Sequence, residues 1–130
     1  MEVARAHLVL KQYEKILEAL NRYVGNLSVP RVMGLRAIAF KKLGDNEKSD
    51  AELDHLIKRS KETSGGSPSF YTAMVYASRG ETEQAFRWLE KSFADNEVEL
   101  FWLKVEPEFA SLYDDPRWQE MLHRIGFPEN

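Results

Sequence analysis

The chain of 130 residues contains no cysteine, and this absence excludes several kinds of chemistry. Without a thiol there can be no disulfide, no thiolate metal ligand and no cysteine nucleophile. A cysteine-free composition suits the reducing cytoplasm, where we expect the protein to reside. Met1 leads into a charged amphipathic stretch, which is not the pattern of a signal peptide.

Long apolar runs are also missing. The longest, VELFWLKV at 98–105, is interrupted by Glu99 and Lys104 and falls far short of the roughly 20 residues that span a bilayer. We therefore expect no membrane partner.

An excess of positive charge is lacking as well. Lysine and arginine total 18 against 21 aspartate and glutamate residues, which gives a formal charge of −3 at pH 7. A chain with this balance has no overall attraction to phosphates, so nucleic acid is not an expected partner. Neither G-x-x-x-x-G-K-[ST] nor G-x-G-x-x-G occurs in the sequence, and we expect no nucleotide cofactor.

Groups that carry catalysis are few and scattered. His7, His55 and His123 lie far apart in the sequence and show no H-x-x-x-H spacing, so a metal site is not indicated. Asp114 and Asp115 resemble a pair of glycosidase acids, but helix capping explains Asp115 equally well. We expect no catalytic residues, no metal and no enzymatic activity.

What the sequence does contain is helical periodicity arranged in pairs. In YTAMVYASRGETEQAFRWLEKS, residues 71–92, apolar residues recur at intervals of three and four on both sides of Gly80. This spacing predicts two helices joined by a turn at the glycine. The segment 34–60 repeats the pattern around Gly44, 36 residues earlier, and Lys11 takes the same place 33 residues before that. A period of this length built from paired helices indicates a solenoid.

The spacing of small and large residues within these units resembles the tetratricopeptide repeat. The positions that carry the resemblance are Ala73, Tyr76, Ala85 and Leu89 in one unit, and Ala37, Phe40, Ser49 and Leu53 in the unit before it. The resemblance implies an all-α fold, a right-handed solenoid of antiparallel helix hairpins in one domain over residues 1–130. We expect hairpins over 2–26, 28–62 and 67–96, followed by a terminal capping segment over 97–128.

The tail, FWLKVEPEFASLYDDPRWQEMLHRIGFPEN, is similar to the segment that closes tetratricopeptide regions in bacterial multidomain regulatory proteins. We expect Asp115 to cap a last helix that ends near Ile125, with a buried stripe of Trp118, Met121, Leu122 and Ile125. Ser67 before Pro68 predicts a cap for an earlier helix. Trp88, Trp102 and Trp118 are expected in the core and not in an aromatic ligand cage.

One set of residues lies beside the faces that join helices within a hairpin. In a solenoid these flanks align into a concave strip that binds partners. The predicted partner-binding residues are Arg31, Leu35, Ile38, Lys42, Phe70, Tyr71 and Met74. The alternative is that the C-terminal helix or a second copy of the chain fills the strip.

These observations favour a scaffold that binds a protein or peptide segment in a concave helical groove, without a cofactor. Two alternatives remain open at this stage. The chain is the regulatory or sensory C-terminal part of a larger signalling enzyme or transcription regulator, or it is a self-association module that forms a homodimer.

Overall fold

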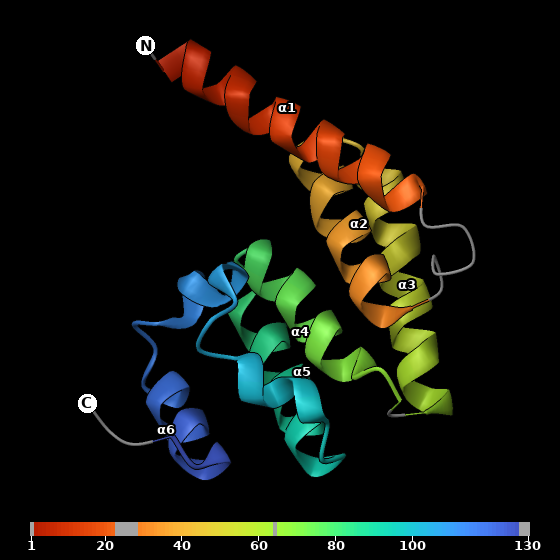
Figure 1. Ribbon diagram of the computed structural model, residues 1–130. Coiled ribbons are helices and arrows are strands. Elements are labelled where there is room, and N and C mark those ends of the chain that lie inside the picture. Colours follow the sequence, from red (N-terminus) through yellow and green to blue (C-terminus); the bar gives the residue numbers. More distant parts are fainter. Residues whose placement is uncertain (1, 23–28, 64, 128–130) are drawn as a thin grey trace.

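The structure is a computed structural model that describes residues 2–22, 29–63 and 65–127, with side chains from Leu10 onward (Figure 1). Within these residues there is no strand, so the predicted all-α class is confirmed. The helices are α1 (Glu2–Asn21), α2 (Pro30–Lys42), α3 (Asn46–Glu62), α4 (Pro68–Ser78), α5 (Thr82–Ala94) and α6 (Pro116–Ile125), and the 3-10 helices η1 (Val98–Trp102) and η2 (Pro107–Leu112) lie between α5 and α6.

Two helix hairpins form the body of the molecule. Helix α2 packs along α3, and α4 packs along α5. The two tight turns contain Gly44 and Gly80, whose φ angles of 87° and 75° lie in the left-handed region that glycine adopts without strain. The sequence predicted both turns correctly.

The hairpins stack because α4 packs against both α2 and α3, while α1 packs on α2 (Figure 1). Residues 2–26 were expected to form a further hairpin. The structure instead has the single helix α1 over most of this range, and residues 23–26 lie outside the described part of the chain.

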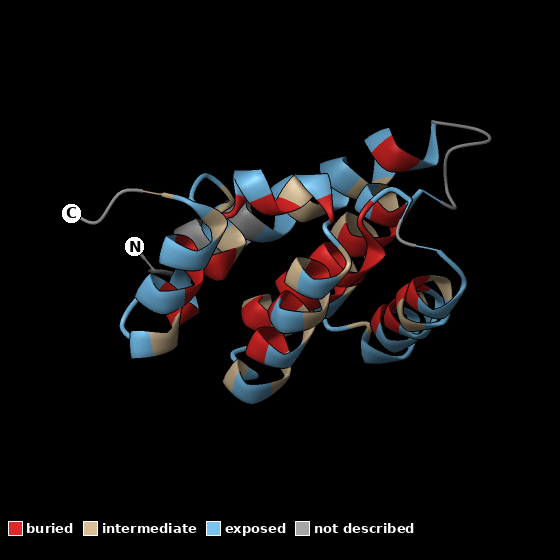
Figure 2. Ribbon diagram, turned by 90° about the horizontal axis from the view of Figure 1, so that it is seen from below, coloured by how far each residue is buried: buried red, intermediate tan, exposed pale blue. Residues whose placement is uncertain are grey.

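The last helix follows the prediction closely. The carboxylate of Asp115 accepts a hydrogen bond of 2.9 Å from the backbone N–H of Arg117, and Gly126 ends the helix with a φ of 113°. Trp118, Met121 and Leu122 are buried as predicted, whereas Ile125 is only half-buried. They extend a core that begins in α2 and passes through α4, as the buried residues in Figure 2 show.

Trp102 departs from the expectation that all three tryptophans are core residues. Trp118 is buried and Trp88 is half-buried, but 55% of Trp102 is exposed. Among the helices described, none has both the length and the apolarity needed to cross a membrane.

Candidate functional site

The seven residues predicted to bind a partner divide into an interior group and a surface group. Arg31 and Lys42 are exposed, and Leu35 is half-buried. The other four have at most 3% of their surface exposed: Ile38, Phe70, Tyr71 and Met74. Contrary to expectation, these four side chains belong to the core and do not line an open groove.

Helix α2 covers one side of the predicted strip. A Cβ built on Gly34 of α2 would lie only 3.2 Å from the Cβ of Tyr71 and 3.7 Å from the methyl group of Met74. The missing side chain at Gly34 therefore lets the two helices approach closely, and the two halves of the strip pack against each other.

The segment after α5 covers the other side. The ring of Phe109 in η2 lies with its centroid 5.4 Å from that of Phe70, which in turn meets Tyr71 edge to face at 5.1 Å. The chain's own terminal segment therefore covers this side of the strip through η1 and η2, since Glu99 of η1 accepts a hydrogen bond from Tyr71 and η2 packs on α4. The final helix, which was the expected occupant, packs behind this segment, with Trp118 against Phe109.

Glu97 fastens this segment to the start of α4. Its carboxylate accepts hydrogen bonds from the backbone N–H groups of Ser69 (3.2 Å) and Phe70 (2.8 Å), and from the hydroxyl of Ser92 (2.8 Å). A carboxylate at a helix N-terminus satisfies free N–H groups and complements the helix dipole. Ser67 was expected to cap α4, but it has left-handed φ and ψ, and its hydroxyl makes no capping bond to the helix.

A polar cluster lies at the border of the strip. The guanidinium of Arg31 donates to the hydroxyl oxygen of Tyr71 at 3.4 Å, and that hydroxyl donates to the carboxylate of Glu99 at 3.0 Å. Burial raises the pKa of Tyr71 to about 12, although the Arg31 hydrogen bond opposes the change. These hydrogen bonds connect α2, α4 and η1 through the phenol group of Tyr71. Because the pKa of this phenol is far above 7, the hydroxyl stays protonated near neutral pH and is not suited to proton transfer there.

The most exposed apolar surface is on η1 and the turn after it. Four side chains form what we call the η1 ridge, with exposed fractions of 69% for Val98, 65% for Phe101, 55% for Trp102 and 65% for Val105. Because a 3-10 helix has three residues per turn, Val98 and Phe101 share one edge while Trp102 and Val105 share the next. Leu100 and Leu103 occupy the third edge and are buried.

A cavity opens beside the ridge. Its volume is about 340 Å³, and it is lined by Phe93, Asn96, Glu97, Leu100, Phe101 and Ile125. Phe101 belongs to both the cavity wall and the ridge, so the protruding surface and the recess are continuous. A protruding aromatic next to an apolar recess is the form that interaction hot spots take.

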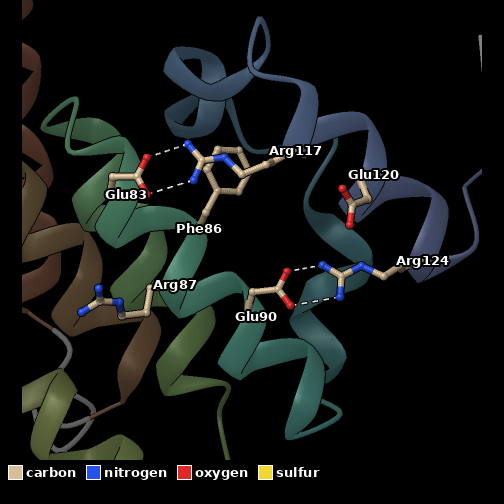
Figure 3. A pocket seen from close by; sticks show the side chains of 7 residues that line it. All are labelled: Glu83, Phe86, Arg87, Glu90, Arg117, Glu120 and Arg124. Carbon is tan, nitrogen blue, oxygen red and sulfur yellow. Dashed lines mark hydrogen bonds and ion pairs between the residues drawn. The ribbon is translucent and has the colours of Figure 1, made fainter.

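A second groove of about 440 Å³ separates α5 from α6 (Figure 3). Paired ions cross it: Arg117 makes two hydrogen bonds to Glu83, at 3.0 and 2.9 Å, and Arg124 bonds Glu90 in the same two-pronged way. Arg117 also lies 4.4 Å from the centroid of the Phe86 ring. Because these opposite charges already pair with one another, we interpret the groove as the interface that joins the terminal helix to the rest of the molecule.

One expectation concerned metal ligands. No group of three or more histidine, aspartate or glutamate side chains among the described residues is arranged to hold a metal ion. The η1 ridge is the feature that sequence reasoning missed. Its signal is the segment VELFWLKV, in which apolar residues occupy every phase of a three-residue turn, so that some of them must face outward.

Comparison with known protein families, with curated proteins and with solved structures finds no match to this chain.

Proposed function

We propose that the protein is an interaction module: a tetratricopeptide-like array of helix hairpins that binds a protein segment without chemical turnover. The stacked hairpins and the repeated small-residue positions support this proposal. Ala37, Ala73 and Ala85 are fully buried, as residues at close helix crossings must be.

The η1 ridge is the observation that carries the proposal. Its four side chains, each more than half exposed, present on the order of 400 Å² of apolar surface, within the range of patches that are functional on soluble proteins. Among the other described residues, large apolar side chains such as Phe70 and Phe109 are fully buried, and those that are exposed, such as Ile16 and Tyr113, show at most 43% of their surface. The partner therefore docks on the ridge and in the cavity beside it. Of the seven residues predicted from the sequence to bind a partner, only Arg31, Leu35 and Lys42 remain accessible to that partner.

Selection from a random peptide library, with subtraction on a ridge variant, tests this function. The variant Phe101→Ser with Trp102→Ser removes the ridge aromatics, and Ile16→Ser, at an exposed apolar position of α1, is the matched control. We expect peptides that bind the wild type and the control but bind the ridge variant at least about 30-fold more weakly. A library that yields no ridge-dependent peptide from a folded protein would rule the function out.

Self-association is the second candidate, because an exposed aromatic ridge suits a second copy of the same chain as well as a foreign partner. Light scattering over a range of concentrations separates the two. A dimer that the ridge variant converts to a monomer, while Ile16→Ser leaves it intact, would favour the homodimer.

A further inference from the structure

We propose that the segment that docks on the η1 ridge is basic and amphipathic, with an apolar anchor flanked by lysine or arginine. This inference rests on the proposed function, and it adds the chemistry of the partner. It follows from where the chain places its acidic residues.

Charge is distributed unevenly along the chain. Residues 95–115, which contain the ridge, include seven acidic residues and only one basic residue, Lys104. The remainder of the chain has more basic than acidic residues. The ridge is therefore embedded in the acidic part of a protein whose overall charge is close to neutral.

Part of this acidity is already used inside the protein. Asp95 pairs with Lys91 at 2.8 Å, Asp115 pairs with Arg117 at 2.8 Å, and Glu97 is occupied by the start of α4. Of the remaining acidic residues, Glu99 accepts a hydrogen bond from the Tyr71 hydroxyl, and Glu106 and Glu108 directly follow the ridge in the sequence. Each is only partly buried and accessible to a partner.

The two edges of the ridge differ in charge. Glu99 shares an edge with Trp102 and Val105, because the three are spaced by one 3-10 turn. Lys104 falls on the other edge, with Val98 and Phe101, and its ammonium lies 5.5 Å from the centroid of the Phe127 ring.

The edge that carries Trp102 is thus the acidic one. Arg31 lies near this edge: its hydrogen bond to Tyr71 raises its pKa most, and the charges of Glu106 and Glu99 add to the increase.

A basic amphipathic segment complements both features of this edge. Its apolar anchor covers Trp102 and Val105 or enters the cavity beside Phe101, while its cations approach the partly exposed carboxylates of Glu99, Glu106 and Glu108. A lysine or arginine can also stack on the exposed indole, which is the aromatic ring that attracts cations most strongly. The same acidic rim repels nucleic acid and anionic lipid, so neither fits this surface.

Matched synthetic peptides test the inference. The probes are an amphipathic peptide of leucine and lysine, about 15 residues long, its leucine and glutamate counterpart, and a scrambled leucine and lysine peptide of the same composition. Tryptophan fluorescence reports binding directly, because Trp102 is the most exposed of the three tryptophans. We expect the unscrambled basic peptide to bind at least about tenfold more tightly than the acidic peptide. Its affinity should fall as the salt concentration rises, because salt screens the charges.

Two variants connect that binding to the proposed residues. Trp102→Ser with Phe101→Ser, the ridge variant already described, should abolish binding of the unscrambled basic peptide; because this variant lacks the Trp102 indole, a fluorescent label on the peptide reports its binding. Glu106→Gln with Glu108→Gln should weaken it about fivefold and flatten its salt dependence, whereas Glu62→Gln, at the exposed end of α3, should leave it unchanged.

The outcomes separate the two proposals. If the acidic peptide binds the ridge as well as the basic one, or if the library yields ridge-dependent peptides without basic residues, the basic partner is wrong and the interaction module stands. Equal binding of the scrambled and ordered peptides, or binding that survives loss of the ridge aromatics, overturns the basic amphipathic partner. If no library peptide depends on the ridge, the interaction module itself fails.

Discussion

Two apolar surfaces of similar composition differ in burial, because one is covered by other parts of the chain and the other is exposed. Phe70, Tyr71 and Met74 of α4 are almost completely buried, whereas Phe101 and Trp102 of η1 are more than half exposed. Helix α4 lies in the middle of the molecule and packs against α2, α3, α5 and η2, while η1 uses only one of its three edges to reach the core (Figure 1). Periodicity reveals which residues share a face, but a segment elsewhere in the chain decides whether that face is covered.

Replacing one phenylalanine from each surface with alanine tests this contrast most strongly. Phe70→Ala leaves a cavity between Tyr71 and Phe109, and we expect it to lower the free energy of unfolding by about 3 to 5 kcal/mol. Phe101→Ala removes a side chain that is 65% exposed, so its cost should stay below about 1 kcal/mol. Urea denaturation of both variants measures the difference, and similar losses would mean that the ridge is part of the core.

A smaller effect is expected at the carboxylate that holds the terminal segment over α4. Glu97→Ala leaves the N–H groups of Ser69 and Phe70 without an acceptor, and an unsatisfied buried polar group costs about 1 to 3 kcal/mol. Glu97→Gln keeps an acceptor oxygen and should cost less. Denaturation compares them, with Glu62→Ala at the exposed end of α3 as control, and a Glu97→Ala loss no larger than the control's would contradict the role of Glu97 as a clamp that holds the terminal segment on α4.

The features predicted from sequence are the ones with local signals. Gly44 and Gly80 end helices as expected, because glycine adopts a left-handed φ angle without strain. Asp115 caps α6 as expected, because its carboxylate bonds a backbone N–H only two residues ahead. The clamp by Glu97 joins residues 27 and 28 positions apart, and no local pattern encodes it. Nor does helical periodicity in α4 contain the information that η2 will pack over Phe70.

Tyr71 allows a finer test at the boundary between the two surfaces. Its pKa is raised from 10.0 to about 12 by burial, so the folded state holds a proton that the unfolded state has released between those values. Stability should therefore be intact below pH 10 and fall as the pH rises from about 10 to about 12. Tyr71→Phe should cost about 1 kcal/mol near neutral pH through lost hydrogen bonds, and should remove this alkaline loss.

To check this prediction, the free energy of unfolding is measured for the wild type and for Tyr71→Phe from pH 8 to about pH 12, and the two values are compared at each pH. Tyr113→Phe is the control, since Tyr113 is 43% exposed. A difference that does not change with pH would show that the phenol of Tyr71 ionises as readily in the folded state as in the unfolded chain.

The smallest effect concerns the ionic joint between α5 and α6, and it asks whether charges or the core hold the terminal segment in place. The side chain of Arg117, followed by its backbone N–H, lowers the pKa of Asp115 from 3.8 to about 2. A lowered folded-state pKa adds stability that is present above 3.8 and disappears as the pH falls toward 2. Asp115→Asn keeps an oxygen for the cap and should change the thermal midpoint little at pH 7, because Asp115 and Arg117 are partly exposed and solvent screens their charges. Between pH 4 and about pH 2 the variant should lose less stability than the wild type, whereas Asp114→Asn, one residue away and exposed, should follow the wild type.

If Asp115→Asn instead destabilised the protein as much at pH 7 as Phe70→Ala, surface ions and not the buried contacts of Phe109 would hold the terminal segment, and the contrast between the covered strip and the open ridge would need another explanation.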